Sequence, residues 1–142
     1  MQEIDTEKLL HSLKQAENFQ TALAKTSPHT IDQTAKKFLN QWLEIKQTTK
    51  SAVLKKAGIT EATGYQYFDG KRNPSREKMI ALAIGFSLTL EETNELLKKT
   101  GHAQLYPKHP WDAVVIYGLS HRLTILEIDD YLYEAGLKTF GE

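Results

Sequence analysis

Helix-starting and helix-ending residues alternate along most of this chain and divide it into short segments. Thr or Ser side chains can cap a helix at its start, and glycine can adopt the left-handed conformation that closes its end. The expected caps are Thr49, Thr60, Ser75, Thr89 and Thr124, and the expected stops are Gly58, Gly70, Gly101 and Gly136. No β-alternation of useful length occurs, so the chain is predicted to be all-α with about eight helices.

Two longer amphipathic helices are predicted ahead of these segments. Over residues 5–26, apolar side chains recur at three- and four-residue steps: Leu9, Leu13, Ala16, Phe19 and Leu23. Pro28 interrupts this pattern, because proline disfavours helix at the preceding residue. A second helix is expected from about Thr30 or Asp32 to Gln47. Its stripe is dense enough for a central core helix: Ile31, Ala35, Phe38, Leu39, Trp42, Leu43 and Ile45.

An internal repeat covers the C-terminal part of the chain. The pattern Asn73-Pro74, Thr89, Gly101 recurs as His109-Pro110, Thr124, Gly136, at offsets of 36, 35 and 35 residues. Each unit is predicted to be a helix, a capping threonine with an acidic first turn, a second helix and a glycine stop. Leu96 and Leu97 match Tyr131 and Leu132 at the core positions. Two stacked helical hairpins are expected, with residues 102–109 as a packed connection.

The formal net charge is zero, but the charges are segregated along the sequence. Residues 46–78 hold 8 basic and 3 acidic side chains, a net charge of +5, whereas residues 79–142 have a net charge of −4. A concentrated basic segment is typical of a phosphate-facing surface, and a solvated basic face without a partner is the alternative. There are no cysteines, no secretory signal and no membrane-spanning run, which favours a cytoplasmic protein without a membrane partner.

The basic segment contains two short predicted helices joined by a tight turn and followed by a basic loop. Ala57-Gly58-Ile59-Thr60 forms the turn, in which glycine allows a sharp reversal and Ile59 can fill the space between the helices. Residues 70–75, GKRNPS, then supply backbone amides and Lys, Arg, Asn and Ser side chains as donors to phosphate oxygens. This order predicts a helix-turn-helix that places its second helix in the major groove.

KKAGIT followed by QYFDGKRNPS resembles the XRE-type, lambda-repressor-like (Cro/repressor) DNA-binding domains of bacteria and phages, over about residues 31–100. The resemblance implies a five-helix helix-turn-helix domain over residues 30–102. The N-terminal amphipathic helix, in residues 1–29, and a C-terminal helical hairpin, in residues 103–142, lie outside it. The resemblance also implies base-reading positions at Glu61, Ala62, Tyr65 and Gln66. The implied phosphate contacts are Thr49, Lys50, Lys71, Arg72 and Asn73.

The chain departs from the family pattern at three positions. Gly64 replaces an apolar residue in the recognition helix and should weaken that helix by about 1 kcal/mol. Leu54 occupies a position that is usually a small alanine, and Lys50 replaces a common glutamine. With the zero net charge, Gly64 and Leu54 also favour a rival hypothesis: a protein-interaction adaptor or antagonist that retains the fold and binds a partner through its acidic helical hairpins.

The remaining aromatic and charged residues are interpreted mainly as structural. Tyr67 and Phe68 are expected to pack inside, with Tyr65 exposed. Trp111, Tyr117, Tyr131, Tyr133 and Phe140 make the C-terminal unit aromatic-rich, and core packing is expected for Tyr117 and Tyr131. The five histidines lack metal-ligand spacing, so no metal or cofactor is expected. Paired acidic residues such as Asp129 and Asp130 are better explained as solvated helix faces than as acid–base catalysts.

The leading prediction is therefore a non-enzymatic, sequence-specific regulator of transcription that binds double-stranded DNA. A single helix-turn-helix reads few base pairs, and pairing two across a two-fold axis doubles the site. This favours a homodimer, with residues 1–29 or the C-terminal hairpin, residues 103–142, as candidate contacts. The acidic hairpin is also the candidate surface for a protein partner.

Overall fold

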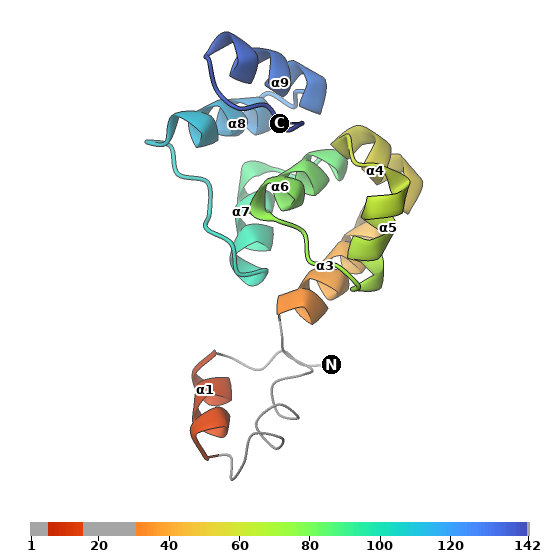
Figure 1. The fold of residues 1–142 in the computed structure, drawn as a ribbon, viewed down its shortest axis with the longest axis vertical. Helices are drawn as coiled ribbons and strands as arrows, with labels where there is room; N and C mark the ends of the chain where they lie inside the picture. Colours follow the sequence, from red (N-terminus) through yellow and green to blue (C-terminus); the bar gives the residue numbers. More distant parts are fainter. Residues whose placement is uncertain (1–5, 16–30, 142) are drawn as a thin grey trace.

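A computed structural model of the chain describes residues 6–15 and 31–141, and all regular secondary structure within these ranges is α-helix (Figure 1). The expected all-α class is confirmed for the described part of the chain. The helices are α1 (Thr6–Gln15), α3 (Ile31–Lys46), α4 (Lys50–Ala57), α5 (Glu61–Asp69), α6 (Arg76–Gly85), α7 (Leu90–Lys99), α8 (Pro110–Ser120) and α9 (Ile125–Glu134). None of them is long and apolar enough to cross a membrane.

Five helices begin after the caps that the sequence indicated, and four helix ends lie at the expected glycine stops. The side-chain oxygens of the five expected caps each accept a backbone N–H of the first turn: Thr49, Thr60, Ser75, Thr89 and Thr124. Glu92 and Glu127 complete reciprocal capping boxes with the last two. The four expected stops all have positive φ: Gly58, Gly70, Gly101 and Gly136. Local sequence thus determines these helix limits.

A continuous hydrophobic core extends from α3 to the last residues of the chain. Leu39 of α3 and Phe68 of α5 are almost completely buried, and the Phe68 ring meets Phe86 edge-on at 6.4 Å. The apolar stripe of α3 is only partly internal, because Ile45 is 64% exposed. Figure 1 shows α3 to α7 forming one body, with α8 and α9 stacked on its far end.

The internal repeat is present in the contacts of the two C-terminal hairpins, α6–α7 and α8–α9. Arg76 Nε donates to the Ala103 carbonyl (2.9 Å), and 35 residues later Trp111 Nε1 donates to the Lys138 carbonyl (2.9 Å). Asn94 Oδ1 accepts the Leu105 amide, just as Asp129 Oδ1 accepts the Phe140 amide, both at 2.8 Å. In each hairpin, two hydrogen bonds at equivalent positions therefore hold the segment that follows the second helix against the hairpin.

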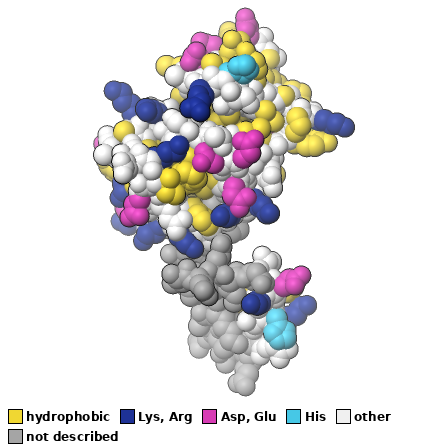
Figure 2. Space-filling view, turned by 180° about the vertical axis from the view of Figure 1, so that it is seen from behind, with side chains coloured by type: hydrophobic (Ala, Val, Ile, Leu, Met, Phe, Trp, Pro, Cys, Tyr) yellow, Lys and Arg dark blue, Asp and Glu magenta, His cyan; other side chains and the backbone are white. Residues whose placement is uncertain are grey.

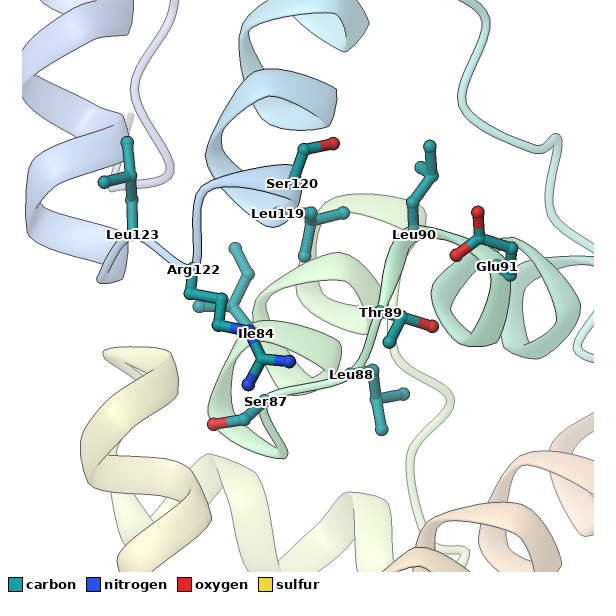
Figure 3. A pocket seen from close by; sticks show the side chains of 10 residues that line it. All are labelled: Ile84, Ser87, Leu88, Thr89, Leu90, Glu91, Leu119, Ser120, Arg122 and Leu123. Carbon is teal, nitrogen blue, oxygen red and sulfur yellow. The ribbon is translucent and has the colours of Figure 1, made fainter.

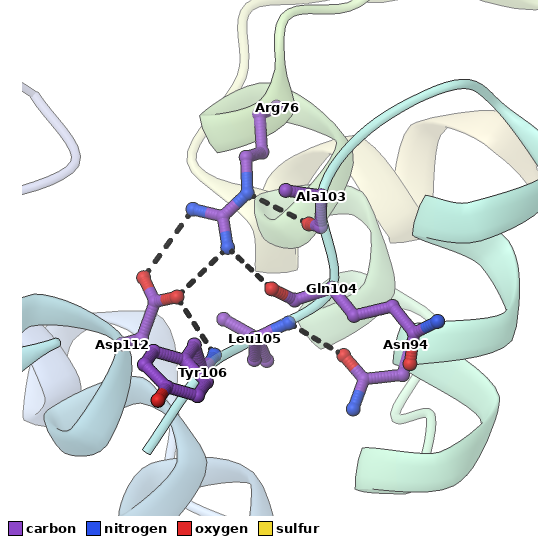
Figure 4. Close-up of polar contacts among 7 residues, drawn as sticks. All are labelled: Arg76, Asn94, Ala103, Gln104, Leu105, Tyr106 and Asp112. Carbon is purple, nitrogen blue, oxygen red and sulfur yellow. Dashed lines mark hydrogen bonds and ion pairs between the residues drawn. The ribbon is translucent and has the colours of Figure 1, made fainter. Parts of the chain in front are cut away.

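The connection between the hairpins is tied down by polar contacts (Figure 4). Asp112 at the start of α8 is 5% exposed and accepts from both terminal nitrogens of Arg76 at 2.9 and 3.3 Å. The same carboxylate accepts the Tyr106 amide at 2.9 Å. Arg76 also donates to the Ala103 and Gln104 carbonyls. This cluster joins α6, the connection and α8.

Two of the aromatic residues expected in the core lie on the surface. Tyr117 is 47% exposed and Tyr131 is 44% exposed, although Leu132 beside Tyr131 is fully buried. The two rings meet edge-on at 5.7 Å, and Tyr117 also lies against His121 at 4.2 Å. The core prediction for Tyr117 and Tyr131 is wrong, because no described helix packs on this side of α8–α9.

The N-terminal helix is described only in part. α1 covers Thr6–Gln15 and has no buried residue, while the rest of the expected helix over 5–26 lies outside the described residues. In Figure 1, α1 stands apart from the body, at the opposite end from α8 and α9.

Candidate nucleic-acid interface

A three-residue turn fixes α5 relative to α4. Gly58 has φ 69°, which a residue with a Cβ rarely adopts, and the Ile59 amide donates back to the Leu54 carbonyl at 3.0 Å. Ile59 is buried, as expected for the residue between the helices. The Ser51 hydroxyl donates to Glu61 Oε1 at 2.7 Å and so links the first turns of the two helices. The start of α4 therefore lies beside the start of α5.

Gly64 does not interrupt α5, and its lack of a side chain makes room for Leu54 of α4. A Cβ built on Gly64 would lie 2.2 Å from one Leu54 methyl carbon and 2.4 Å from the other. Leu54 is completely buried, and α5 runs without a break through Gly64. The large Leu54 of α4 and the small Gly64 of α5 thus fit together, because the glycine leaves space for the leucine side chain.

The last hairpin also pairs a large residue with a small one, but in the opposite order along the chain. Gly118 of α8 and Ile128 of α9 hold the positions that Leu54 and Gly64 hold, counted from the turn. A Cβ on Gly118 would lie 2.4 Å from Ile128 Cγ1. In the middle hairpin these positions are Ala83 and Thr93, both completely buried. Each crossing therefore includes at least one small residue, which allows the helices to approach closely.

The four predicted base-reading residues are together on the outer face of α5. Glu61, Ala62, Tyr65 and Gln66 are all exposed, whereas Tyr67 and Phe68 point into the core, as expected. Residues three or four positions apart are neighbours on a helix surface, and this spacing links Tyr65 to Glu61 and Ala62, and Gln66 to Ala62. Asn40 of α3 donates to the Phe68 carbonyl at 3.0 Å and holds the end of α5 against the core. The face is therefore presented by a helix fixed at both ends.

The loop after α5 offers side chains but fewer free amides than expected. Lys71, Arg72 and Asn73 are exposed. The Lys71 and Arg72 amides, however, both donate to the Gln66 carbonyl, at 3.0 and 3.3 Å, and the Gly70 amide donates to the Tyr67 carbonyl. The expectation that the amides of these three residues serve as phosphate donors is therefore wrong, because they close the end of α5 instead.

The other two predicted phosphate contacts differ in accessibility. Thr49 is exposed, but its hydroxyl oxygen accepts the Ala52 amide at 3.1 Å as the cap of α4. Lys50 is half-buried, with its Nζ 5.8 Å from the centroid of the Phe68 ring. Lys71 and Arg72 are both exposed and are therefore the more accessible cations of the predicted set.

Arg72 also acts on a tyrosine beneath the surface. Burial raises the pKa of Tyr67 above its ordinary value of 10.0, and the Arg72 charge lowers this pKa by a smaller amount. The phenol is therefore kept neutral inside the domain, while the cation remains outside it.

The basic side chains are not all part of one surface. Arg76, counted in the basic segment, is turned toward α8 and paired with Asp112. Figure 2 views the molecule from behind, and Lys and Arg side chains gather along its left side, where α4 and α5 lie when Figure 1 is turned round. The charge segregation seen in the sequence is thus partly retained on the surface.

A pocket of about 420 Å³ lies away from α5, between the ends of the two C-terminal hairpins (Figure 3). Ser87 and Arg122 line it and have positive φ values, 59° and 55°, at the positions equivalent to Gly58 in the first turn. The Arg122 side chain extends toward the end of α6 in Figure 3. Sequence reasoning missed both residues, although the 35-residue offset that pairs them was visible. No group of acidic and histidine side chains suited to a metal occurs among the described residues.

Comparisons with protein-family models, with curated proteins and with solved structures found no match for this chain.

Proposed function

We propose that the chain is a transcriptional regulator that binds double-stranded DNA through α5. The observation that carries the proposal is the outer face of α5, where the four base-reading candidates lie exposed together and are followed directly by the exposed Lys71 and Arg72. In this arrangement α4 and α5 form a helix-turn-helix within a lambda-repressor-like domain of the XRE type. Side chains at one end position the helix on phosphates, and the helix face reads base edges.

Residue roles follow from the accessible atoms. Lys71 and Arg72 neutralise phosphates, and Asn73 and the N-terminal turn of α4 complete the positioning contacts. Gln66 has an amide that can pair with adenine in two bonds, and Tyr65 contacts a base or a phosphate from the same face. Glu61 is held by Ser51 and can accept from the amino group of cytosine. The proposed function requires no catalysis and no cofactor, and the chain without cysteines suits the cytoplasm.

The Lys71→Ala, Arg72→Ala double variant tests the phosphate role. Binding to every duplex should weaken, and the slope of log affinity against log salt should fall by about 2. The matched control is Lys98→Ala, Lys108→Ala, which removes the same charge from exposed positions on α7 and in the α7–α8 connection. Unchanged affinity in the first variant, or equal losses in both, would refute the proposed phosphate contacts.

Base reading is tested separately with Gln66→Ala on sites selected from a random DNA library. We expect binding to the selected site to weaken by about 1–3 kcal/mol, with little change on random duplex. A loss of the same size on both kinds of DNA would place Gln66 outside the reading surface.

The exposed pair Tyr117 and Tyr131 supports a second candidate function. With Glu134 nearby, these rings form an acidic aromatic surface suited to a protein partner, as in an adaptor or antagonist that retains a helix-turn-helix fold. A salt titration with random duplex separates the two functions. No measurable binding at about 50 mM salt would favour the adaptor, because nonspecific affinity is strongest at low salt.

A further inference from the structure

The outer side of the last hairpin is the counterpart of a surface that is buried in the preceding one. The 35-residue offset pairs Met79, Leu82 and Leu96 of the α6–α7 hairpin with Val114, Tyr117 and Tyr131 of the α8–α9 hairpin. The first three are 0%, 0% and 3% exposed, whereas Tyr117 and Tyr131 are 47% and 44% exposed. Equivalent sides of the two hairpins thus differ: the side is covered in α6–α7 and exposed to solvent in α8–α9.

A helix from elsewhere in the chain helps to cover the first of these surfaces. Phe38 and Trp42 of α3 line one groove together with Leu96 and Lys99 of α7, and Lys99 Nζ lies 4.9 Å from the Phe38 ring centroid. On the second hairpin, Val114, Tyr117, Tyr131 and Glu134 line an open hollow of about 480 Å³. The hollow has apolar walls and room for the side chains of an amphipathic helix.

The charges beside the hollow specify the kind of helix that fits. In the first hairpin, Glu95 pairs with Lys99 at 3.6 Å. The equivalent residues in the second hairpin are Asp130 and Glu134, two carboxylates one helical turn apart. Neither forms an ion pair with another described residue. Like charges at this spacing repel, so a partner helix with a cation next to its apolar face would relieve them.

The chain itself carries such a helix. No residue of α1 is buried, and Leu10 is 50% exposed. Leu13 and Lys14 lie one turn further along the same side, which places a cation beside the leucines. Figure 1 shows α1 and the α8–α9 hairpin at opposite ends of the molecule, an arrangement suited to contact between two copies.

We propose that α1 of one copy docks on the Tyr117–Tyr131 face of a second copy, as α3 lies on α7 within one chain. The contact is reciprocal under a two-fold axis and gives a closed homodimer. Leu10 and Leu13 enter the hollow, and Lys14 meets Asp130 and Glu134. This goes beyond the proposed DNA binding and is tested without DNA.

Cross-linking tests the geometry, since the natural chain has no cysteine. Leu10→Cys protein mixed with Tyr131→Cys protein and a short bis-maleimide should give a covalent dimer of the two variants. The matched control replaces Tyr131→Cys with Leu126→Cys, which is also exposed on α9 but outside the hollow. A chain that carries both Leu10→Cys and Tyr131→Cys should also cross-link between copies. If it cross-links only within one chain, or if the Tyr131→Cys and Leu126→Cys proteins give equal yields of cross-linked dimer, the proposal is overturned.

Sedimentation velocity tests the association itself. The full chain should be dimeric, and Tyr131→Ala should weaken dimerisation about tenfold or more, whereas Tyr133→Ala, an exposed tyrosine on the same helix outside the hollow, should not. Lys14→Glu should also weaken it, and Asp130→Lys combined with Glu134→Lys should restore it. A full chain that stays monomeric at all concentrations, or the absence of charge-swap rescue, would overturn the proposal.

Discussion

At the scale of single residues, the pairing of Leu54 with Gly64 shows how a change at one position depends on another. From the sequence alone, Gly64 is expected to weaken the second helix, and Leu54 is a large residue at a position where the resemblance implies a small one. In the structure they form one close contact, in which the glycine receives the leucine. The sequence could not predict this compensation, because nothing local indicates which residue of α4 faces which residue of α5.

A double-mutant cycle measures this pair. Gly64→Ala should destabilise the protein by about 1–3 kcal/mol, because its Cβ would overlap the Leu54 side chain. Leu54→Ala should cost about 2–5 kcal/mol through the cavity it leaves. The double variant should be more stable than the sum of the two losses predicts, by at least about 0.5 kcal/mol. Urea unfolding gives all three values, and strict additivity would show that the two side chains do not compete for space.

Tyr67 makes the stability depend on alkaline pH. Its pKa is raised by burial, so the unfolded chain loses the phenolic proton at lower pH than the folded chain does. The free energy of unfolding should therefore be unaffected by this group below about pH 10 and fall as the pH rises through the raised folded pKa. Tyr67→Phe should remove this part of the decline. Equal pH profiles for the two proteins, measured by urea unfolding, would contradict the assignment.

At the scale of helices and hairpins, capping residues in the sequence predicted where several helices begin and end. Which side chains of those helices are exposed depends instead on tertiary packing. The starts at the threonines and Ser75 and the stops at the glycines are local properties, so the sequence was sufficient for them. Tyr131 was placed in the core because its repeat partner Leu96 is a core residue type. Its actual exposure depends on whether a further helix covers the hairpin. The repeat pattern carries no information about that.

The Arg76–Asp112 cluster should be the main polar link between the two C-terminal hairpins. Asp112→Ala would leave Arg76 without its partner and the Tyr106 amide without its acceptor, at a cost of about 3 kcal/mol in urea unfolding. Glu95→Ala is the matched control, because its ion pair with Lys99 is exposed and worth at most about 1 kcal/mol. Equal losses in the two variants would show that the buried cluster does not stabilise the fold.

At the scale of the whole molecule, zero net charge conceals a division of surfaces. Residues 46–78, which include α4 and α5, have a net charge of +5, whereas residues 79–142 have a net charge of −4. The sequence indicated this division and the exposed face of α5. It could not show that Arg76 is used internally, or that the amides of Gly70, Lys71 and Arg72 close α5, because both depend on contacts made in the folded chain.

Removing residues 1–15 separates association from folding. Because no residue of α1 is buried, the free energy of unfolding of the monomer should change by no more than about 0.5 kcal/mol. The midpoint of thermal unfolding should rise with protein concentration for the full chain and stay constant for the shortened one. Calorimetry at several concentrations checks both statements, and the same concentration dependence in both proteins would exclude α1 from the dimer contact.

The bond from Trp111 to the Lys138 carbonyl has an optical consequence. The protein has two tryptophans: Trp42 lies on α3, and Trp111 packs against Phe140 at 5.3 Å in the last hairpin. The tryptophan emission of a Trp42→Phe protein therefore comes only from the C-terminal hairpin, and that of a Trp111→Phe protein comes only from α3. Comparing the fluorescence changes of the two proteins during unfolding would show whether the last hairpin unfolds before, with or after the part of the molecule that contains α3.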